Sequence, residues 1–99
     1  MTERIRRGSG NVFKDAGFPT EEAAHLLIRT DLMIQIEKIL EERGLTQAKS
    51  AKLLGVSQPR VSDLVRGRIR LFSIDTLVGF LARLGVSVSL HTRRSRRVA

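Results

Sequence analysis

The longest run of helical periodicity lies in the first half of the chain, where apolar residues recur every three or four positions. These residues are Ala23, Ala24, Leu27, Ile28, Leu32, Ile36, Ile39 and Leu40. The spacing predicts an amphipathic helix that begins at Thr20, a capping residue after Pro19, and that ends before Gly44. Because Thr30 is also a good capping residue, the pattern allows either one long helix or two helices that meet at Thr30 and Asp31.

Two shorter helical patterns follow and are separated by the tripeptide Gly-Val-Ser. Thr46 is expected to cap the first pattern, which ends at Gly55, where a left-handed cap residue is needed. Ser57 is expected to cap the second pattern, which carries Pro59 in its first turn and ends at Gly67. Two short helices joined by so tight a turn are typical of a helix-turn-helix.

The second short helix cannot be stable in isolation and must be held by packing. At about 100° per residue, Val61, Leu64 and Val65 cluster on one of its sides. The opposite side carries Pro59, Ser62, Asp63 and Arg66. We therefore expect the apolar side to be buried and the opposite side to be free for a ligand.

A further helical pattern follows a short connection. It begins with Ser73 as the cap and ends at Gly85, and its apolar residues are Leu77, Phe80, Leu81 and Leu84. This spacing predicts a helix that covers the core.

Residues 86–91 alternate strictly between apolar and polar side chains, which predicts a half-buried β-strand. One strand cannot be stable alone. Its partner is the segment around Asn11 to Phe13, the same strand of a second subunit, or another protein. The sequence leaves these three alternatives open.

The chain has 99 residues and a formal net charge of +8, which suits a single domain with a modest core. The charge is placed unevenly: residues 1–59 carry nine Lys/Arg and eight Asp/Glu, whereas residues 60–99 carry nine and two. We expect a flexible basic arm over residues 1–10, a folded domain over residues 11–91 and a disordered basic tail over residues 92–99. The basic half of the chain begins inside the second short helix, and a basic surface on such a helix indicates that the ligand is a polyanion. Double-stranded DNA is the polyanion whose groove fits a helix of this size.

Other classes of function find little support. The chain has no cysteine, which excludes disulfides and thiolate metal sites. His25 and His91 have no neighbouring ligand residues, and no serine belongs to a nucleophile motif, so we predict no metal, no cofactor and no catalysis. No apolar run is long enough for a signal peptide or a membrane span, and we expect a cytoplasmic protein. The absence of Tyr and Trp argues against binding of single-stranded RNA.

At the motif, the residues resemble the lambda-repressor-like, or Xre-type, helix-turn-helix family. In that family a Gln opens each motif helix, and Gln47 and Gln58 hold those places here. Ala51 matches the small residue between the helices, Gly55 the turn glycine, and Val61 the interior anchor of the second helix. The resemblance implies a mainly all-α fold, a lambda-repressor-like bundle of about five helices. The alternating segment adds a short C-terminal β-strand.

A wider set of motifs is similar to one subgroup of this family, whose members resemble HigA-type antitoxins. The motifs are residues 11–18, 44–47, 57–64, 67–68 and 72–73. Such antitoxins repress their own operon as dimers and bind a small RelE-like ribonuclease toxin. The resemblance implies a homodimeric repressor on an inverted-repeat operator, with a RelE-like toxin as its partner. A stand-alone regulator and a protein that acts mainly as a toxin-binding inhibitor are the alternatives.

The docking geometry of such helices predicts which residues contact DNA. The first residues of a recognition helix reach base edges, so the predicted base-reading residues are Gln58, Pro59, Arg60 and Ser62. Helix N-termini and arginines hold phosphates, so the predicted phosphate-binding residues are Thr46, Gln47, Ser57, Arg66, Arg68 and Arg70. Asp63 repels phosphate, and it is useful only if it meets a cytosine amine or orients an arginine.

Overall fold

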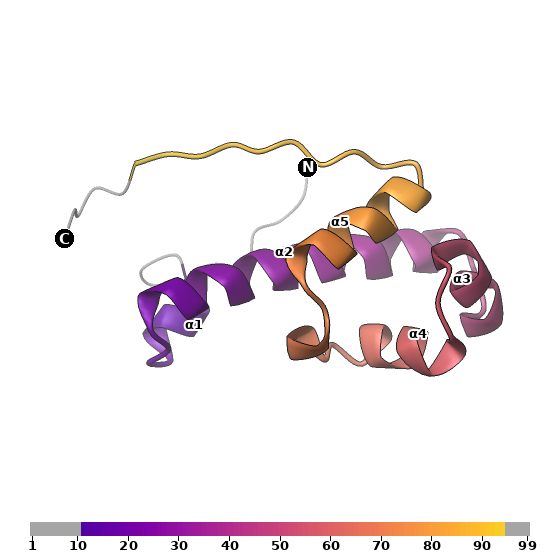
Figure 1. The fold of residues 1–99 in the computed structure, drawn as a ribbon, viewed down its shortest axis with the longest axis horizontal. Helices are drawn as coiled ribbons and strands as arrows, with labels where there is room; N and C mark the ends of the chain where they lie inside the picture. The colour runs from indigo at the N-terminus through magenta and orange to yellow at the C-terminus, as the bar shows by residue number, and fades with distance from the viewer. Residues whose placement is uncertain (1–10, 95–99) are drawn as a thin grey trace.

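The computed structural model describes residues 11–94, which form five α-helices and one short 3-10 helix (Figure 1). The elements are α1 (Val12–Asp15), α2 (Thr20–Glu42), α3 (Gln47–Leu54), α4 (Gln58–Val65), η1 (Ile69–Leu71) and α5 (Ile74–Arg83). The helical bundle expected from the sequence is confirmed. The predicted basic arm over residues 1–10 lies outside the described residues, as do residues 95–99 of the predicted tail.

Helix α2 is one continuous helix of 23 residues, so the alternative of two helices is wrong. The hydroxyl of Thr30 is buried without a hydrogen-bond partner and caps nothing. The start also differs from the prediction, because the Pro19 carbonyl already accepts the first helical hydrogen bond, from Ala23 N at 2.8 Å. Pro19 is therefore the N-cap, and Thr20 is the first helical residue.

A short helix, α1, precedes α2 and was not predicted. Asn11 caps it, since its Oδ1 accepts hydrogen bonds from the backbone N–H groups of Phe13 at 3.0 Å and Lys14 at 3.1 Å. The Asn11 amide also donates to the Ala23 carbonyl at 3.3 Å, which ties α1 to α2. The segment that we considered as a strand partner is therefore helical.

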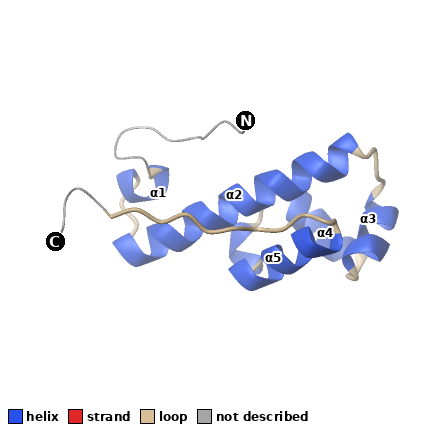
Figure 2. Cartoon of the chain, turned by 90° about the horizontal axis from the view of Figure 1, so that it is seen from above, coloured by secondary structure: helices blue, strands red, loops and turns tan. Residues whose placement is uncertain are grey.

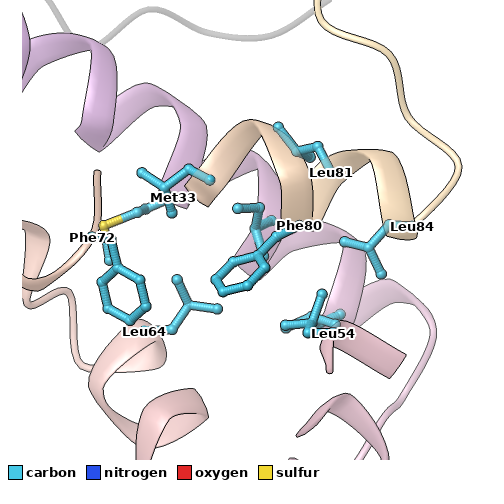
Figure 3. Close-up of a cluster of buried hydrophobic side chains, with 10 residues drawn as sticks. Met33, Leu54, Leu64, Phe72, Phe80, Leu81 and Leu84 are labelled. Atoms are coloured by element: carbon cyan, nitrogen blue, oxygen red, sulfur yellow. The ribbon is translucent and has the colours of Figure 1, made fainter. Parts of the chain in front are cut away.

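The core lies where α2 meets α3, α4 and α5. Its buried members, each at most 5% exposed, are Met33, Ile36, Leu40, Leu54, Leu64, Phe72, Leu77, Phe80, Leu81 and Leu84. Figure 3 shows labelled side chains from these elements converging on one cluster, in which the rings of Phe72 and Phe80 meet edge to face at 6.1 Å. All four residues predicted to let the last helix cover the core are buried, which confirms that prediction.

The predicted apolar face of α2 is only partly buried. Ala23 and Ile36 lie in the interior, whereas Ala24 is exposed and Ile28 is 46% exposed. Helix α2 is apolar on more than one side, and its neighbours in the fold decide which side is covered. The periodicity of this helix predicted its existence better than its orientation.

The predicted C-terminal strand does not form within the single chain. Residues 86–91 are extended but belong to no strand, and the part of the chain that the structure describes contains no β-structure. The segment leaves α5 and runs back along α2 toward the end of the molecule that carries α1 (Figures 1 and 2). Val88 is 38% exposed and Leu90 is 88% exposed. A strand needs a partner, and the intended partner in this chain forms α1 instead.

Candidate nucleic-acid interface

The turn between α3 and α4 sets the geometry of the site. Gly55 adopts a left-handed conformation, with φ of 74° and ψ of 33°. The Gly55 N–H donates to the Lys52 carbonyl at 3.3 Å and the Val56 N–H to the Ala51 carbonyl at 2.9 Å, which closes α3 as a Schellman motif. A Cβ at position 55 would lie 3.0 Å from the guanidinium of Arg83. The turn therefore favours glycine for its left-handed conformation, and a larger residue would also displace the flexible end of the Arg83 side chain.

The predicted caps fix where α3 and α4 begin. Thr46 Oγ1 accepts a hydrogen bond from Lys49 N at 3.1 Å, and Ser57 Oγ accepts one from Arg60 N at 3.3 Å. Gln47 and Gln58 are the first helical residues, and both are exposed. These helix boundaries confirm the sequence-based predictions for the motif.

Helix α4 has a buried side and an open side. Val61 is 1% exposed and Leu64 3% exposed, which confirms that they anchor the helix. Pro59 is exposed and Ser62 half-buried. The helix therefore presents its first turn to solvent while its inner side is held in the core.

Arg60 differs from its neighbours in the first turn because its side chain is engaged within the protein. Its guanidinium carbon lies 4.0 Å from the centre of the Phe72 ring. Its Nη1 also donates a hydrogen bond of 2.8 Å to the Leu71 carbonyl. The side chain thus connects the start of α4 to the end of η1. That Arg60 reads bases stays a prediction.

Arg68 forms an ion pair with Asp63, its Nε lying 3.6 Å from Oδ1. The Arg68 N–H also donates to the Asp63 carbonyl at 3.1 Å. The second role considered for Asp63, orienting an arginine, therefore has a candidate partner in Arg68. Because the Arg68 side chain is 53% exposed, it remains accessible from solvent.

Arg70 is held by residues that sequence reasoning did not connect with the site. Its Nη2 lies 2.8 Å from Glu22 Oε2 at the start of α2, and its guanidinium carbon is 5.8 Å from the centre of the Phe18 ring. These residues are some fifty positions away in the sequence, and no local pattern indicates the pairing. The Arg70 side chain is 63% exposed.

The structure leaves most of the predicted contact residues at the surface. The exposed members are Thr46, Gln47, Ser57, Gln58, Pro59, Arg66, Arg68 and Arg70. They belong to the starts of α3 and α4 and to the chain that leaves α4 through η1. Two capped helix N-termini and three arginines suit a polyanion whose groove accepts α4.

No three His, Cys, Asp or Glu side chains within residues 11–94 are grouped so that they could hold a metal ion. None of the helices over the same residues is long and apolar enough to cross a membrane.

Comparisons with known proteins agree with this geometry. Residues 12–93 match the model of a family described as "Helix-turn-helix domain". A solved structure named "Putative XRE Family Transcriptional Regulator" is 27% identical in sequence and superposes with a TM-score of 0.70. The match covers 79% of this chain and 88% of the other. No curated protein matches the sequence.

Proposed function

Because the chain belongs to the helix-turn-helix domain family, whose model covers residues 12–93, we propose that it is a DNA-binding transcriptional regulator of the Xre type. The observation that carries the proposal is the first turn of α4, whose Gln58 and Pro59 are exposed on a helix anchored by Val61 and Leu64. A helix held in this way can enter the major groove without rearrangement.

The residues of this interface divide into two groups. Gln58, Pro59 and Ser62 lie where a recognition helix meets base edges, and Gln58 offers the paired donor and acceptor that match adenine. The phosphate contacts fall to the starts of the two motif helices and to the arginines that follow α4. These residues are Thr46, Gln47, Ser57, Arg66, Arg68 and Arg70. Arg60 belongs to neither group, because its guanidinium is engaged by Phe72 and Leu71.

The regulator acts as a repressor that binds an inverted repeat as a homodimer. One eight-residue helix reads only a few base pairs, and two copies set about one helical turn apart multiply the specificity. Residues 86–91 support a dimer, because they are extended and expose Val88 and Leu90. Two such segments can pair as antiparallel strands across a two-fold axis.

Selection from a random duplex library tests the proposal. We expect palindromic sites whose half-sites are centred about 10 base pairs apart. The two motif glutamines form a matched pair of variants on the selected duplex. Gln58→Ala should cost about 1 to 3 kcal/mol on this duplex and little on random DNA. Gln47→Ala should weaken both alike. Failure of the unaltered protein to enrich any sequence would contradict the proposal.

A second candidate function is that of an antitoxin that binds a small RelE-like toxin. The observation that favours it is again the extended segment 86–91, since an exposed strand-like segment can add to the sheet of another protein. Co-expression with the product of a neighbouring small reading frame, followed by pull-down, tests it. The antitoxin role is supported if the co-expressed product is pulled down with the full chain but not with a variant that lacks residues 86–94. If no such product is pulled down, a stand-alone regulator is favoured.

A further inference from the structure

The side chain of Arg60 makes two contacts with one short segment of the chain. Its guanidinium carbon lies 4.0 Å from the centre of the Phe72 ring, and its Nη1 donates a hydrogen bond of 2.8 Å to the Leu71 carbonyl. A guanidinium can make both contacts at once because its flat face stacks on a ring while its edge donates hydrogen bonds.

Both ends of this connection are themselves fixed. At one end the Arg60 backbone N–H donates to Ser57, within the cap of α4. At the other end Phe72 is 1% exposed and packs edge to face on Phe80 in the core. Arg60 therefore connects two fixed positions, the first turn of α4 and Phe72 in the core. The chain leaves the end of α4, passes through η1 and returns to the start of α4, where the Arg60 side chain contacts it.

The closed segment carries two of the arginines that we assign to phosphates. Arg68 precedes η1 and Arg70 lies within it. The backbone N–H groups in and after η1 bond to carbonyls only two or three residues earlier, from Ile69 N to Gly67 at 2.8 Å, from Leu71 N to Arg68 at 3.0 Å and from Phe72 N to Ile69 at 3.3 Å. The start of the segment is tied to α4 by the Arg68 N–H bond to the Asp63 carbonyl and by the ion pair of the same two residues. The Arg60 contacts add the connection between the end of the segment and the first turn of α4.

We propose that Arg60 is a positioning residue, which sets the distance between the base-reading turn of α4 and the phosphate-binding arginines of the η1 segment. Its guanidinium acts through Phe72 and Leu71, and it does not itself choose a base. A preorganised interface binds more tightly because less conformational freedom is lost on binding. The inference rests on the proposed function for its effect on DNA, but the connection itself can be tested on the free protein.

The first test is hydrogen exchange of the free protein. Arg60→Lys keeps the positive charge but has no flat face to stack and no fork of donors. We expect the protection of the Leu71 and Phe72 amides to fall about tenfold, with the α2 and α5 amides unchanged. The matched control is Arg66→Lys, because Arg66 is an exposed arginine that follows the same helix. Equal protection in Arg60→Lys and the unaltered protein would overturn the inference.

The second test is the sequence preference of binding. Arg60→Lys should weaken the selected duplex and each of its single-base variants by a similar factor of about ten, with an unchanged slope against salt. If Arg60 instead contacts a base, Arg60→Lys should lose the preference of the protein at one base pair of the site. That result would also overturn the inference. If the unaltered protein selects no duplex, the proposed function fails, while the exchange experiment still decides whether Arg60 holds the segment.

A second variant covers the case in which Arg60→Lys does not fold. Phe72→Leu removes the ring under the guanidinium, keeps an apolar side chain in the core and leaves Arg60 in place. We expect the same local loss of protection at Leu71 and the same uniform loss of affinity. Retained protection at Leu71 in this variant would overturn the inference.

Discussion

Helix α4 and residues 86–91 have equally regular patterns, but only the first forms the element that its pattern predicts. Helix α4 places Val61 and Leu64 against core residues that the same chain supplies. The alternating segment exposes Val88 and Leu90 and forms no strand. The difference teaches that a pattern specifies which surface an element offers, whereas the element forms only where a partner covers that surface.

The largest expected effect distinguishes the two regions by their contribution to the stability of the monomer. Leu64→Ala should lower the free energy of unfolding by about 2 to 5 kcal/mol, because Leu64 is 3% exposed and its loss leaves a cavity. Leu90→Ala should change it by less than about 0.5 kcal/mol, because Leu90 is 88% exposed. Urea unfolding at concentrations where sedimentation shows a monomer measures both values. A large loss in Leu90→Ala would mean that the segment packs within one chain.

The second effect concerns association. In a dimer that buries the paired segments, Leu90→Ala should weaken association by about 1.5 to 3 kcal/mol for each copy. Leu71→Ala is the matched control, because Leu71 is 49% exposed but lies in η1. Sedimentation equilibrium over a range of concentrations gives the dissociation constants. Equal constants for Leu90→Ala and the unaltered protein would remove residues 86–91 from the dimer interface.

These two regions also show what could be predicted from the sequence. The caps Thr46, Ser57 and Ser73 were predictable because a cap bonds to a backbone N–H only a few residues away. The fate of residues 86–91 was not, because it depends on whether another segment supplies a partner. The same holds within the candidate site. The exposure of Gln58 follows from its place on α4, whereas the pairing of Arg70 with Glu22 joins segments that only the tertiary fold brings together.

The third effect compares two serines. Ser57→Ala should lower the free energy of unfolding by about 1 kcal/mol, because Ser57 Oγ caps α4 by accepting a hydrogen bond from Arg60 N. Ser89→Ala, in the segment without a partner, should leave it unchanged within about 0.5 kcal/mol. Thermal and urea unfolding of the two variants under identical conditions check this difference. Indistinguishable losses would mean that the cap contributes no more than an ordinary surface hydroxyl.

The smallest expected effect concerns an internal partner that competes with DNA. The Glu22 carboxylate lies 2.8 Å from Arg70 Nη2, so it competes with a phosphate for this guanidinium and repels the phosphate charge. An exposed pair of this kind contributes about 0.2 to 1 kcal/mol. Glu22→Gln should therefore raise the affinity for any duplex by up to about fivefold, and it should steepen the dependence on salt by about one phosphate contact.

Glu21→Gln is the matched control for this prediction. It removes the same charge one residue earlier in α2, but no ion pair between Glu21 and Arg70 is found among the described residues. Fluorescence anisotropy titrations at several salt concentrations measure affinity and slope together. A gain in Glu22→Gln that Glu21→Gln does not share would assign Arg70 to a phosphate. Equal gains in the two variants would reduce the effect to general repulsion between acidic side chains and DNA, and Glu22 would then hold Arg70 as a structural partner only.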